Sequence, residues 1–121
     1  MTSPTGPLLH LCTEAEWSRA QTLGHVDAPS LTEVGFIHLS APYQVHLPAN
    51  RLFAARTDLL ALHVDPALVT AEIRWEPGVP TDPESMLFPH LYGELPVAAI
   101  VADEPYLPDS EGAFAPLSDA G

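Results

Sequence analysis

Short apolar runs, separated by proline, glycine and acidic residues, recur along the chain and predict a series of strands with short helices between them. Runs of this length that are rich in Val, Ile, Leu and aromatic residues are typical of strands. The strands are expected at residues 8–12, 36–40, 59–65, 71–76, 87–95 and 97–103. Because the run 97–103 is almost continuously apolar, we expect it to be the most buried strand. The run 87–95 contains Pro89, which favours an edge or bent strand.

The segment after the first strand carries the start and stop signals of a helix. Thr13 is placed to cap the first turn, and Glu16, which follows at capping-box spacing, completes the box. Gly24 stands where the C-cap belongs. The stripe expected to face the core consists of Trp17, Ala20 and Leu23.

The second helical segment is interrupted by prolines. Ser40 is placed to cap it, with Pro42 in the first turn, where a missing N–H does little harm. Pro48 is expected to break or kink the helix, which leaves residues 49–56 as its better half. Residues 25–35 carry polar and turn residues and are expected to form a loop.

The order of these elements predicts one α+β domain with a mainly antiparallel sheet. A chain of 121 residues suits a single domain with one core. We expect that domain to span residues 8–105, after a loose leader at residues 1–7. Residues 106–121 are rich in proline, serine and acidic residues, so we expect them to form a mobile tail.

The charge of the chain argues against two kinds of partner. Asp and Glu number 16 against 4 for Lys and Arg, and the net charge is −12. A nucleic-acid binder needs a basic surface and an anionic membrane would repel this chain, so neither is expected. Cys12 is the single cysteine, which excludes a disulfide framework and a cysteine-based zinc site. We see no signal peptide and no apolar run long enough to span a membrane, so we expect a cytoplasmic protein.

The candidate chemistry lies in histidines that stand inside the apolar runs. Alternate side chains of a strand share a face. The three shared faces are Leu8, His10 and Cys12, then Phe36, His38 and Ser40, then Phe88, His90 and Tyr92. If the strands are neighbours, these faces line a single pocket. The alternative is that each histidine is buried and bonded to a backbone carbonyl.

Other chemistries receive less support. The histidines lie on separate segments, without the H-x-H or H-x-x-x-H spacing of many zinc sites, so no metal is expected. Ser40 lacks the G-x-S-x-G elbow of hydrolases. Glu76, beside Trp75, is a candidate carboxylate with a tuned environment, and the alternative is an exposed strand face that pairs it with Arg74. Arg51 is one of the few positive charges open to an anionic ligand.

Five segments of the chain, taken in order, resemble a family of small bacterial proteins known only as a domain of unknown function. They read "LLHLCTEAEW", "GFIHLS", "ANRLF", "RWEP" and "FPHLYGELP". The family pattern is His-x-x-Thr, Gly-Phe-Ile-His-x-Ser, a Gln followed by Ala-Asn-Arg, Trp-Glu and Phe-Pro-His-x-Tyr-Gly. Residues 8 to about 105 match this pattern in order, including Gln44. The resemblance implies an ADP-ribosyltransferase-like fold, a split β-sandwich with two or three short helices.

In that superfamily NAD lies in a cleft between the two halves of the sheet, so the resemblance implies NAD or a related nucleotide as the ligand. By position, His10 is similar to the first-strand residue that holds the adenosine ribose. His38 and Ser40 are similar to the pair on the second strand, and Glu76 is the nearest match to the glutamate of many members.

The resulting hypothesis is an ADP-ribosyltransferase-like enzyme. Histidines would orient ribose hydroxyls or shuttle a proton, and a carboxylate would stabilise an oxocarbenium-like state. The catalytic candidates are His38, Glu76 and His90. The ligand-binding candidates are His10, Thr13, Ser40, Arg51, Arg74 and Tyr92. Two alternatives stay open: a non-catalytic module that binds a nucleotide or another small ligand, and a structural or partner-binding protein with core histidines.

Overall fold

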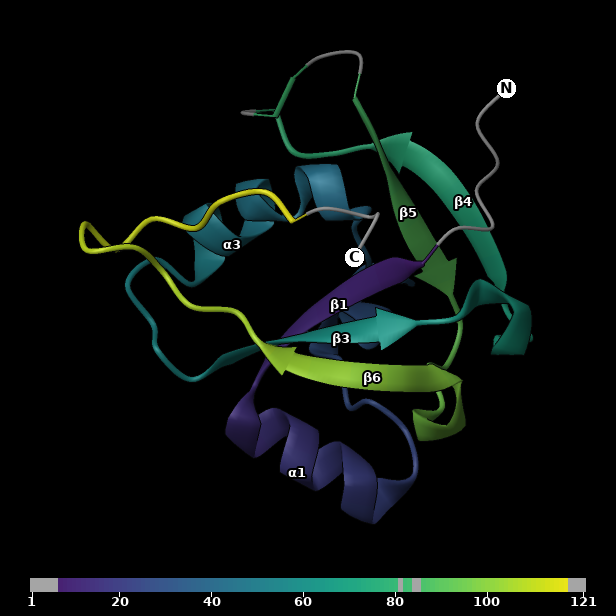
Figure 1. The fold of residues 1–121 in the computed structure, drawn as a ribbon. Helices are drawn as coiled ribbons and strands as arrows, with labels where there is room; N and C mark the ends of the chain where they lie inside the picture. Colours follow the sequence, from purple (N-terminus) through teal and green to yellow (C-terminus); the bar gives the residue numbers. More distant parts are fainter. Residues whose placement is uncertain (1–6, 81, 84–85, 118–121) are drawn as a thin grey trace.

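The computed structural model describes residues 7–80, 82–83 and 86–117, and its strands form two three-stranded sheets (Figure 1). The first sheet has the order β1-β3-β6, with strands at Leu8–Thr13, Leu59–Val64 and Ile100–Pro105. The second sheet has the order β2-β5-β4, with strands at Ile37–His38, Leu87–Tyr92 and Glu72–Pro77. All neighbouring strands in these sheets are antiparallel. The prediction of an α+β protein with antiparallel sheets and short helices is confirmed.

The two sheets meet where β1 passes the residues that follow β2. The backbone N–H of Leu9 donates to the carbonyl of Ser40 at 2.7 Å, and the N–H of Ser40 donates to the carbonyl of Leu9 at 2.9 Å. We call this bridge the seam. It places the side chains of β1 beside those of β2, which lie far apart in the sequence, and it fixes their relative position through backbone bonds.

The first helix, α1 (Glu14–Leu23), begins and ends as the sequence predicts. Thr13 accepts from the N–H of Glu16 at 3.2 Å, and the N–H of Thr13 donates to the Glu16 carboxylate at 2.8 Å. Gly24 closes the helix with a φ of 88°, a left-handed conformation that favours glycine. The predicted inner stripe is too wide, because the side chain of Leu23 is 42% exposed.

Residues 25–35, expected to form a loop, contain a short helix, α2 (Pro29–Glu33). Pro29 stands at its first position, where the absence of an N–H costs nothing. Gly35 follows with a φ of 89° and turns the chain into β2. The loop prediction was therefore wrong at its centre, and the reason is that a helix this short leaves no periodic apolar pattern.

The second predicted helix consists of a 3-10 turn, η1 (Pro42–Gln44), and α3 (His46–Leu52). Ala41, rather than Ser40, precedes the turn. Pro48 does not break α3, because it lies in the first turn, where backbone N–H groups have no partner within the helix. The part expected to be the better helix, 49–56, is helical only as far as Leu52.

Two strand predictions fail on position within the sheets. The strand β6 begins at Ile100, after a 3-10 turn η3 (Val97–Ala99), and forms an edge of the first sheet. It is mostly exposed, with Val101 at 61%, and is therefore not the most buried strand. The strand β5, which was expected to be an edge strand or a bent strand, lies in the centre of the second sheet.

Proline is tolerated in the centre of that sheet because β2 is so short. The carbonyl of Pro89 accepts from the N–H of Leu39 at 3.0 Å. The N–H and C=O of a strand residue point to the same side, so the missing N–H of Pro89 would also have pointed toward β2. Pairing between β2 and β5 covers only Ile37 with Leu91 and His38 with His90. The missing donor thus falls where the ladder ends.

The residues of the first sheet build two hydrophobic clusters, one on each face. One cluster joins this sheet to the second sheet and to α1, through residues such as Leu62, Ile37 and Ala20. The other joins it to α3 and to residues 106–117, through residues such as Leu9 and Phe114. Burying a leucine or isoleucine side chain stabilises the fold by about 1.5–3 kcal/mol. Both clusters therefore hold β1, and with it the seam, in place.

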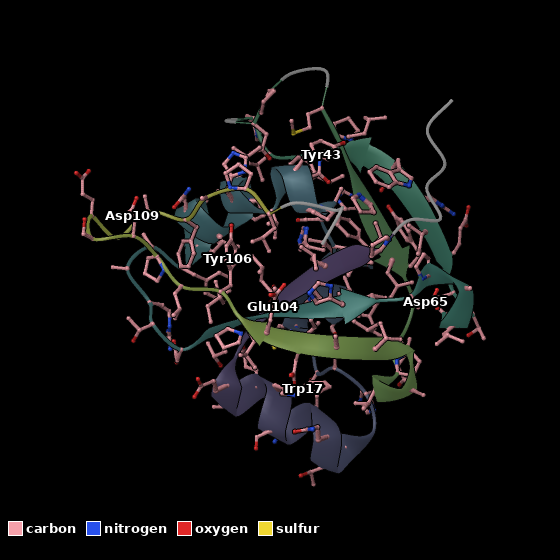
Figure 2. The ribbon with its side chains drawn as sticks, viewed as in Figure 1. Trp17, Tyr43, Asp65, Glu104, Tyr106 and Asp109 are labelled. Atoms are coloured by element: carbon pink, nitrogen blue, oxygen red, sulfur yellow. The ribbon has the colours of Figure 1, made fainter. Side chains whose placement is uncertain are left out.

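Residues 106–117, which the sequence places in a tail beyond the domain, pack against it. Tyr106, labelled in Figure 2, and Phe114 are buried at 5% and 4% exposure. The hydroxyl of Tyr106 donates to the carbonyl of Ala115. The side chain of Asn50 donates to the carbonyl of Phe114 at 3.1 Å and accepts from its N–H at 2.7 Å. The N–H of Leu117 donates to the carbonyl of Pro42 at 3.0 Å.

Of the helices described, none is long and apolar enough to cross a membrane.

Candidate functional site

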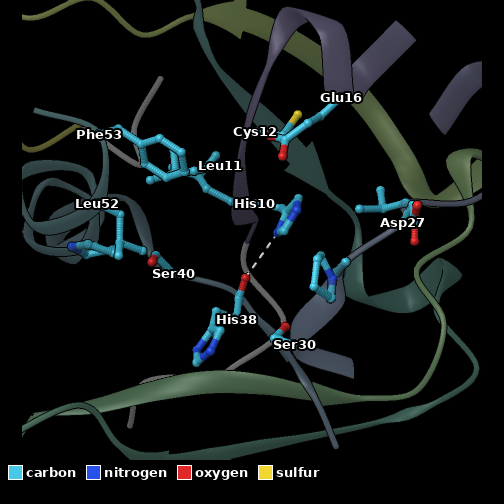
Figure 3. A pocket seen from close by; sticks show the side chains of 15 residues that line it. His10, Leu11, Cys12, Glu16, Asp27, Ser30, His38, Ser40, Leu52 and Phe53 are labelled. Carbon is cyan, nitrogen blue, oxygen red and sulfur yellow. Dashed lines mark hydrogen bonds between the residues drawn. The ribbon is translucent and has the colours of Figure 1, made fainter. Parts of the chain in front are cut away.

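Two cavities lie beside the seam and share part of their walls. The first, of about 190 Å³, is lined by residues of β1, by residues 26–30 and by the end of α3 (Figure 3). The second, of about 140 Å³, is lined by residues of β2 and β5 and by the start of the loop after β4. His38, Ser40 and Pro48 line both cavities.

His10 lies in the wall of the first cavity and is fixed by the backbone of β2. Its Nδ1 is 3.1 Å from the carbonyl oxygen of His38 (Figure 3). A carbonyl only accepts hydrogen bonds, so Nδ1 carries the proton, and Nε2 of the neutral ring keeps its lone pair. Burial lowers the pKa of His10 and outweighs both this hydrogen bond and the nearby Glu16 carboxylate. His10 therefore offers an acceptor nitrogen to a ligand hydroxyl near neutral pH.

His38 stands between the two cavities and belongs to an aromatic cluster with Phe36 and His90. The ring of Phe36 stacks on that of His90 with centroids 4.0 Å apart, and it meets His38 edge-on at 5.0 Å. The rings of His38 and His90 are 5.6 Å apart and nearly perpendicular. Burial lowers the pKa of His38 most, followed by its neighbours His90, Arg51 and His10. A neutral imidazole is thus favoured at the centre of the site.

His90 is buried in the wall of the second cavity and is held by a carboxylate. Its Nδ1 is 2.8 Å from Oε1 of Glu76, and the hydroxyl of Tyr92 donates to the same oxygen at 2.6 Å. These hydrogen bonds, from Tyr92 first and then from His90, lower the pKa of Glu76. The hydrogen bond to Glu76 raises the pKa of Tyr92. Glu76 is therefore an ionised acceptor, and His90 and Tyr92 are its donors.

Arg51 brings positive charge to the second cavity. Its guanidinium lies 3.5 Å from the carboxylate of Asp82, which also accepts from the N–H of Val79 at 3.1 Å. Gly78 lines the same cavity, and a Cβ there would come within 2.3 Å of Asp82 and 2.7 Å of Phe88. A side chain at residue 78 would therefore displace the side chains of Asp82 and Phe88 from their positions.

The structure brings together five of the predicted site residues and places the other four elsewhere. The cavities are lined by His10, His38, Ser40, Arg51 and His90. The side chains of Glu76, Tyr92 and Arg74 form a network behind His90, in which the Arg74 guanidinium lies 4.3 Å from the Tyr92 ring centroid and 3.0 Å from Glu72. Thr13 lines neither cavity, and its hydroxyl caps α1.

Sequence reasoning missed one wall of the first cavity. Residues 26–30 line it, but they fall within the segment expected to be a loop. Pro29, at the start of α2, was the available signal.

Cys12 also lines this cavity, and burial raises the pKa of its thiol to about 12. The thiol is therefore protonated and is a poor nucleophile at neutral pH.

Another signature residue has a structural role. Gln44 is fully buried, accepts from the N–H of Ala41 at 2.9 Å and donates to the carbonyl of Leu87 at 3.0 Å. It thus ties η1 to β5. Within the described ranges, no three His, Cys, Asp or Glu side chains are grouped so that they could hold a metal ion.

Together these features define a small α+β protein with a histidine-lined pair of cavities at the seam of two antiparallel sheets. The chain belongs to the DUF952 family, described as a protein of unknown function, whose family model matches residues 11–103. The resemblance to a domain of unknown function is confirmed, and the likeness to ADP-ribosyltransferases stays a prediction. Among curated proteins, none matches the chain.

Solved structures of protein CC0527 from Caulobacter crescentus are similar to this one. A crystal structure is 27% identical and has a TM-score of 0.77, with 89% of this chain and 92% of that chain covered. A crystal structure of its double mutant gives a TM-score of 0.76 at the same identity and coverage. A solution NMR structure is 26% identical, with a TM-score of 0.71 and coverage of 88% and 90%.

Proposed function

We propose that the protein binds NAD or a related nucleotide in the two adjoining cavities and transfers its ADP-ribosyl group. The observation that supports this proposal is the meeting of His10, His38 and His90, from three strands and two sheets, at the seam. A dinucleotide has two ends joined by phosphates, and two cavities that share His38 suit a ligand of that shape. The resemblance to ADP-ribosyltransferases supports the same ligand.

The residues have distinct tasks in this proposal. His10 accepts a hydrogen bond from a ribose hydroxyl through Nε2, since Nδ1 is committed to the carbonyl of His38. Ser40 offers a hydroxyl to either cavity. Arg51 provides the positive charge for a phosphate, which is scarce in a chain with a net charge of −12. His38, neutral and between the cavities, orients the ligand across the seam.

The position of Glu76 favours a second candidate function. The carboxylate that would stabilise an oxocarbenium-like state is bonded to His90 and Tyr92 and lines neither cavity. A protein that keeps the nucleotide site but lacks a free carboxylate would bind the ligand without turning it over. That protein would be a binding module on the same fold.

Calorimetric titration with NAD, ADP-ribose and nicotinamide, combined with chromatographic detection of released nicotinamide, tests both candidates. We expect saturable binding of NAD, lost in His10→Ala and His38→Ala. The matched control is His63→Ala, because His63 pairs with Glu104 at 2.7 Å and lines neither cavity. Release of nicotinamide supports the enzyme, and binding without release supports the module. No binding of any of the three compounds contradicts the proposal.

A further inference from the structure

The hydrogen bond between His90 and Glu76, behind the second cavity, determines which ring nitrogen of His90 carries the proton. Glu76 is ionised and only accepts hydrogen bonds, so the proton between it and His90 belongs to Nδ1 of His90. In the neutral ring, Nε2 then carries the lone pair. Since Nδ1 is committed to Glu76, Nε2 is the nitrogen left for a molecule in the second cavity, which His90 lines.

We infer that His90 is the general base for a hydroxyl-bearing acceptor in the second cavity, and that Glu76 is the positioning residue that fixes its tautomer. The inference rests on the proposed function, because it names the acceptor class for the same site. A carboxylate that holds one imidazole nitrogen and leaves the other free is the arrangement that general bases use.

The surroundings of His90 hold its ring in one orientation. Its side chain is 7% exposed, and Phe36 stacks on it with an interplanar angle of 17°. Tyr92 donates to the same Glu76 oxygen and so keeps that carboxylate in position. A base with a fixed ring and a fixed tautomer loses little entropy on reaching the transition state.

The chemistry of the second cavity favours a neutral hydroxyl compound over a cationic amine. Its walls include apolar groups such as Phe88 and Val79, and the positive charge of Arg51 lies among them. Among the described residues of the lining, Asp82 is the acidic one, and it is already paired with Arg51. Within that described part of the wall, a lysine or arginine side chain entering as acceptor would therefore find no unpaired carboxylate to offset its charge.

The step balances with the groups named. The acceptor oxygen bonds to the ribose carbon as the carbon–nitrogen bond to nicotinamide breaks. The electrons of that bond leave with nicotinamide, which becomes neutral, and the acceptor proton passes to Nε2 of His90. Water in the same position gives hydrolysis.

The first test is nitrogen NMR of the histidine rings in the full chain. We expect His90 to carry its proton on Nδ1 and to shift toward the other tautomer in Glu76→Ala. Tyr92→Phe is the matched control, because it removes one donor to Glu76 but leaves the bond to His90, and it should keep the wild-type tautomer. A proton on Nε2 of neutral His90 in the wild type would overturn the inference, whatever happens to NAD.

The second test uses NAD with methanol or glycerol as the acceptor probe. In His90→Asn, whose side-chain amide can take the place of Nδ1 and still donate to Glu76, we expect kcat for transfer to the probe to fall by about 100-fold or more, with KM for NAD little changed. Glu76→Ala should show a smaller loss, also in kcat. If the wild type transfers and His90→Asn keeps its rate, His90 is not the base, although the proposed function stands. If the wild type does not turn over NAD, the proposed function fails and the base assignment fails with it.

Discussion

The two cavities each contain a histidine held through Nδ1, but the acceptor differs. In the first cavity a backbone carbonyl holds His10, and in the second a carboxylate holds His90. A carbonyl carries no net charge and gives the ring only a weak preference for its protonated form, so burial dominates and lowers the pKa of His10. A carboxylate gives a stronger, charge-assisted bond. The same residue type is thus held by an uncharged acceptor in one cavity and by a charged acceptor in the next.

The largest expected difference between the cavities is in stability. His90→Ala removes a buried ring that stacks on Phe36 and leaves Glu76 with one donor fewer, so we expect a loss of about 2 kcal/mol or more of unfolding free energy. His10→Ala should cost about 1 kcal/mol, since water can reach the freed carbonyl of His38 beside the cavity. Urea denaturation followed by circular dichroism measures both.

His25→Ala is the control for these two variants, because His25 lines neither cavity and its ring is partly exposed. It should change the unfolding free energy by no more than about 0.5 kcal/mol. Equal losses of unfolding free energy in His10→Ala and His90→Ala would contradict the expectation that the histidine bonded to a carboxylate contributes more to stability.

The pH dependence of stability separates the two cavities further. In the folded protein the pKa values of His10 and His38 are lowered from 6.5, so the unfolded chain binds protons first as the pH falls. Stability should therefore be fully present above pH 6.5 and decline as the pH falls through the folded pKa values. The pKa of Glu76 is lowered from 4.5, so its contribution is present above pH 4.5 and is lost below that value.

Thermal unfolding measured across this range tests the order of the two losses. In the double variant His10→Ala with His38→Ala, the decline that begins below pH 6.5 should shrink, while the decline below pH 4.5 should remain. Glu76→Gln should weaken only the decline at lower pH. A double variant with the wild-type profile would show that these two histidines do not set the first decline.

The sequence predicted the local parts of this site better than the long-range parts. Alternation along two strands placed His38 and His90 on polar faces, and the structure pairs them directly across β2 and β5. The capping box of Thr13 and Glu16 was correct because a helix start depends on neighbours in the chain. Such features depend on few residues close in sequence, so the pattern determines them.

What the sequence could not predict depends on which strands become neighbours. An apolar run has the same pattern at an edge and in the centre of a sheet. The run at β6 was therefore expected to be the most buried strand although it is an exposed edge, and the run at β5 was expected to be an edge or bent strand although it is central. Tyr106 and Phe114 looked like part of a tail because they are buried in a cluster with residues far away in the sequence, such as Leu9 and Ala49. Glu76 was a candidate for direct action on a ligand, and its bond to His90 could not be predicted, because it depends on the register that pairs Arg74 of β4 with His90 of β5.

Among the histidines that line the cavities, the smallest expected effect on stability belongs to His38→Ala. Residue 38 is exposed overall, although the rings of Phe36 and His90 cover part of its ring. The group that accepts from His10 is the backbone carbonyl of residue 38, which alanine retains. We therefore expect the unfolding free energy to stay within about 0.5 kcal/mol of the wild type. Binding of NAD should nevertheless be lost, because the ring lines both cavities. Calorimetry on the same sample measures both quantities. A large loss of stability with binding unchanged would show that His38 has a structural role and does not contact the ligand. The two cavities would then not be joined through His38 into one binding site.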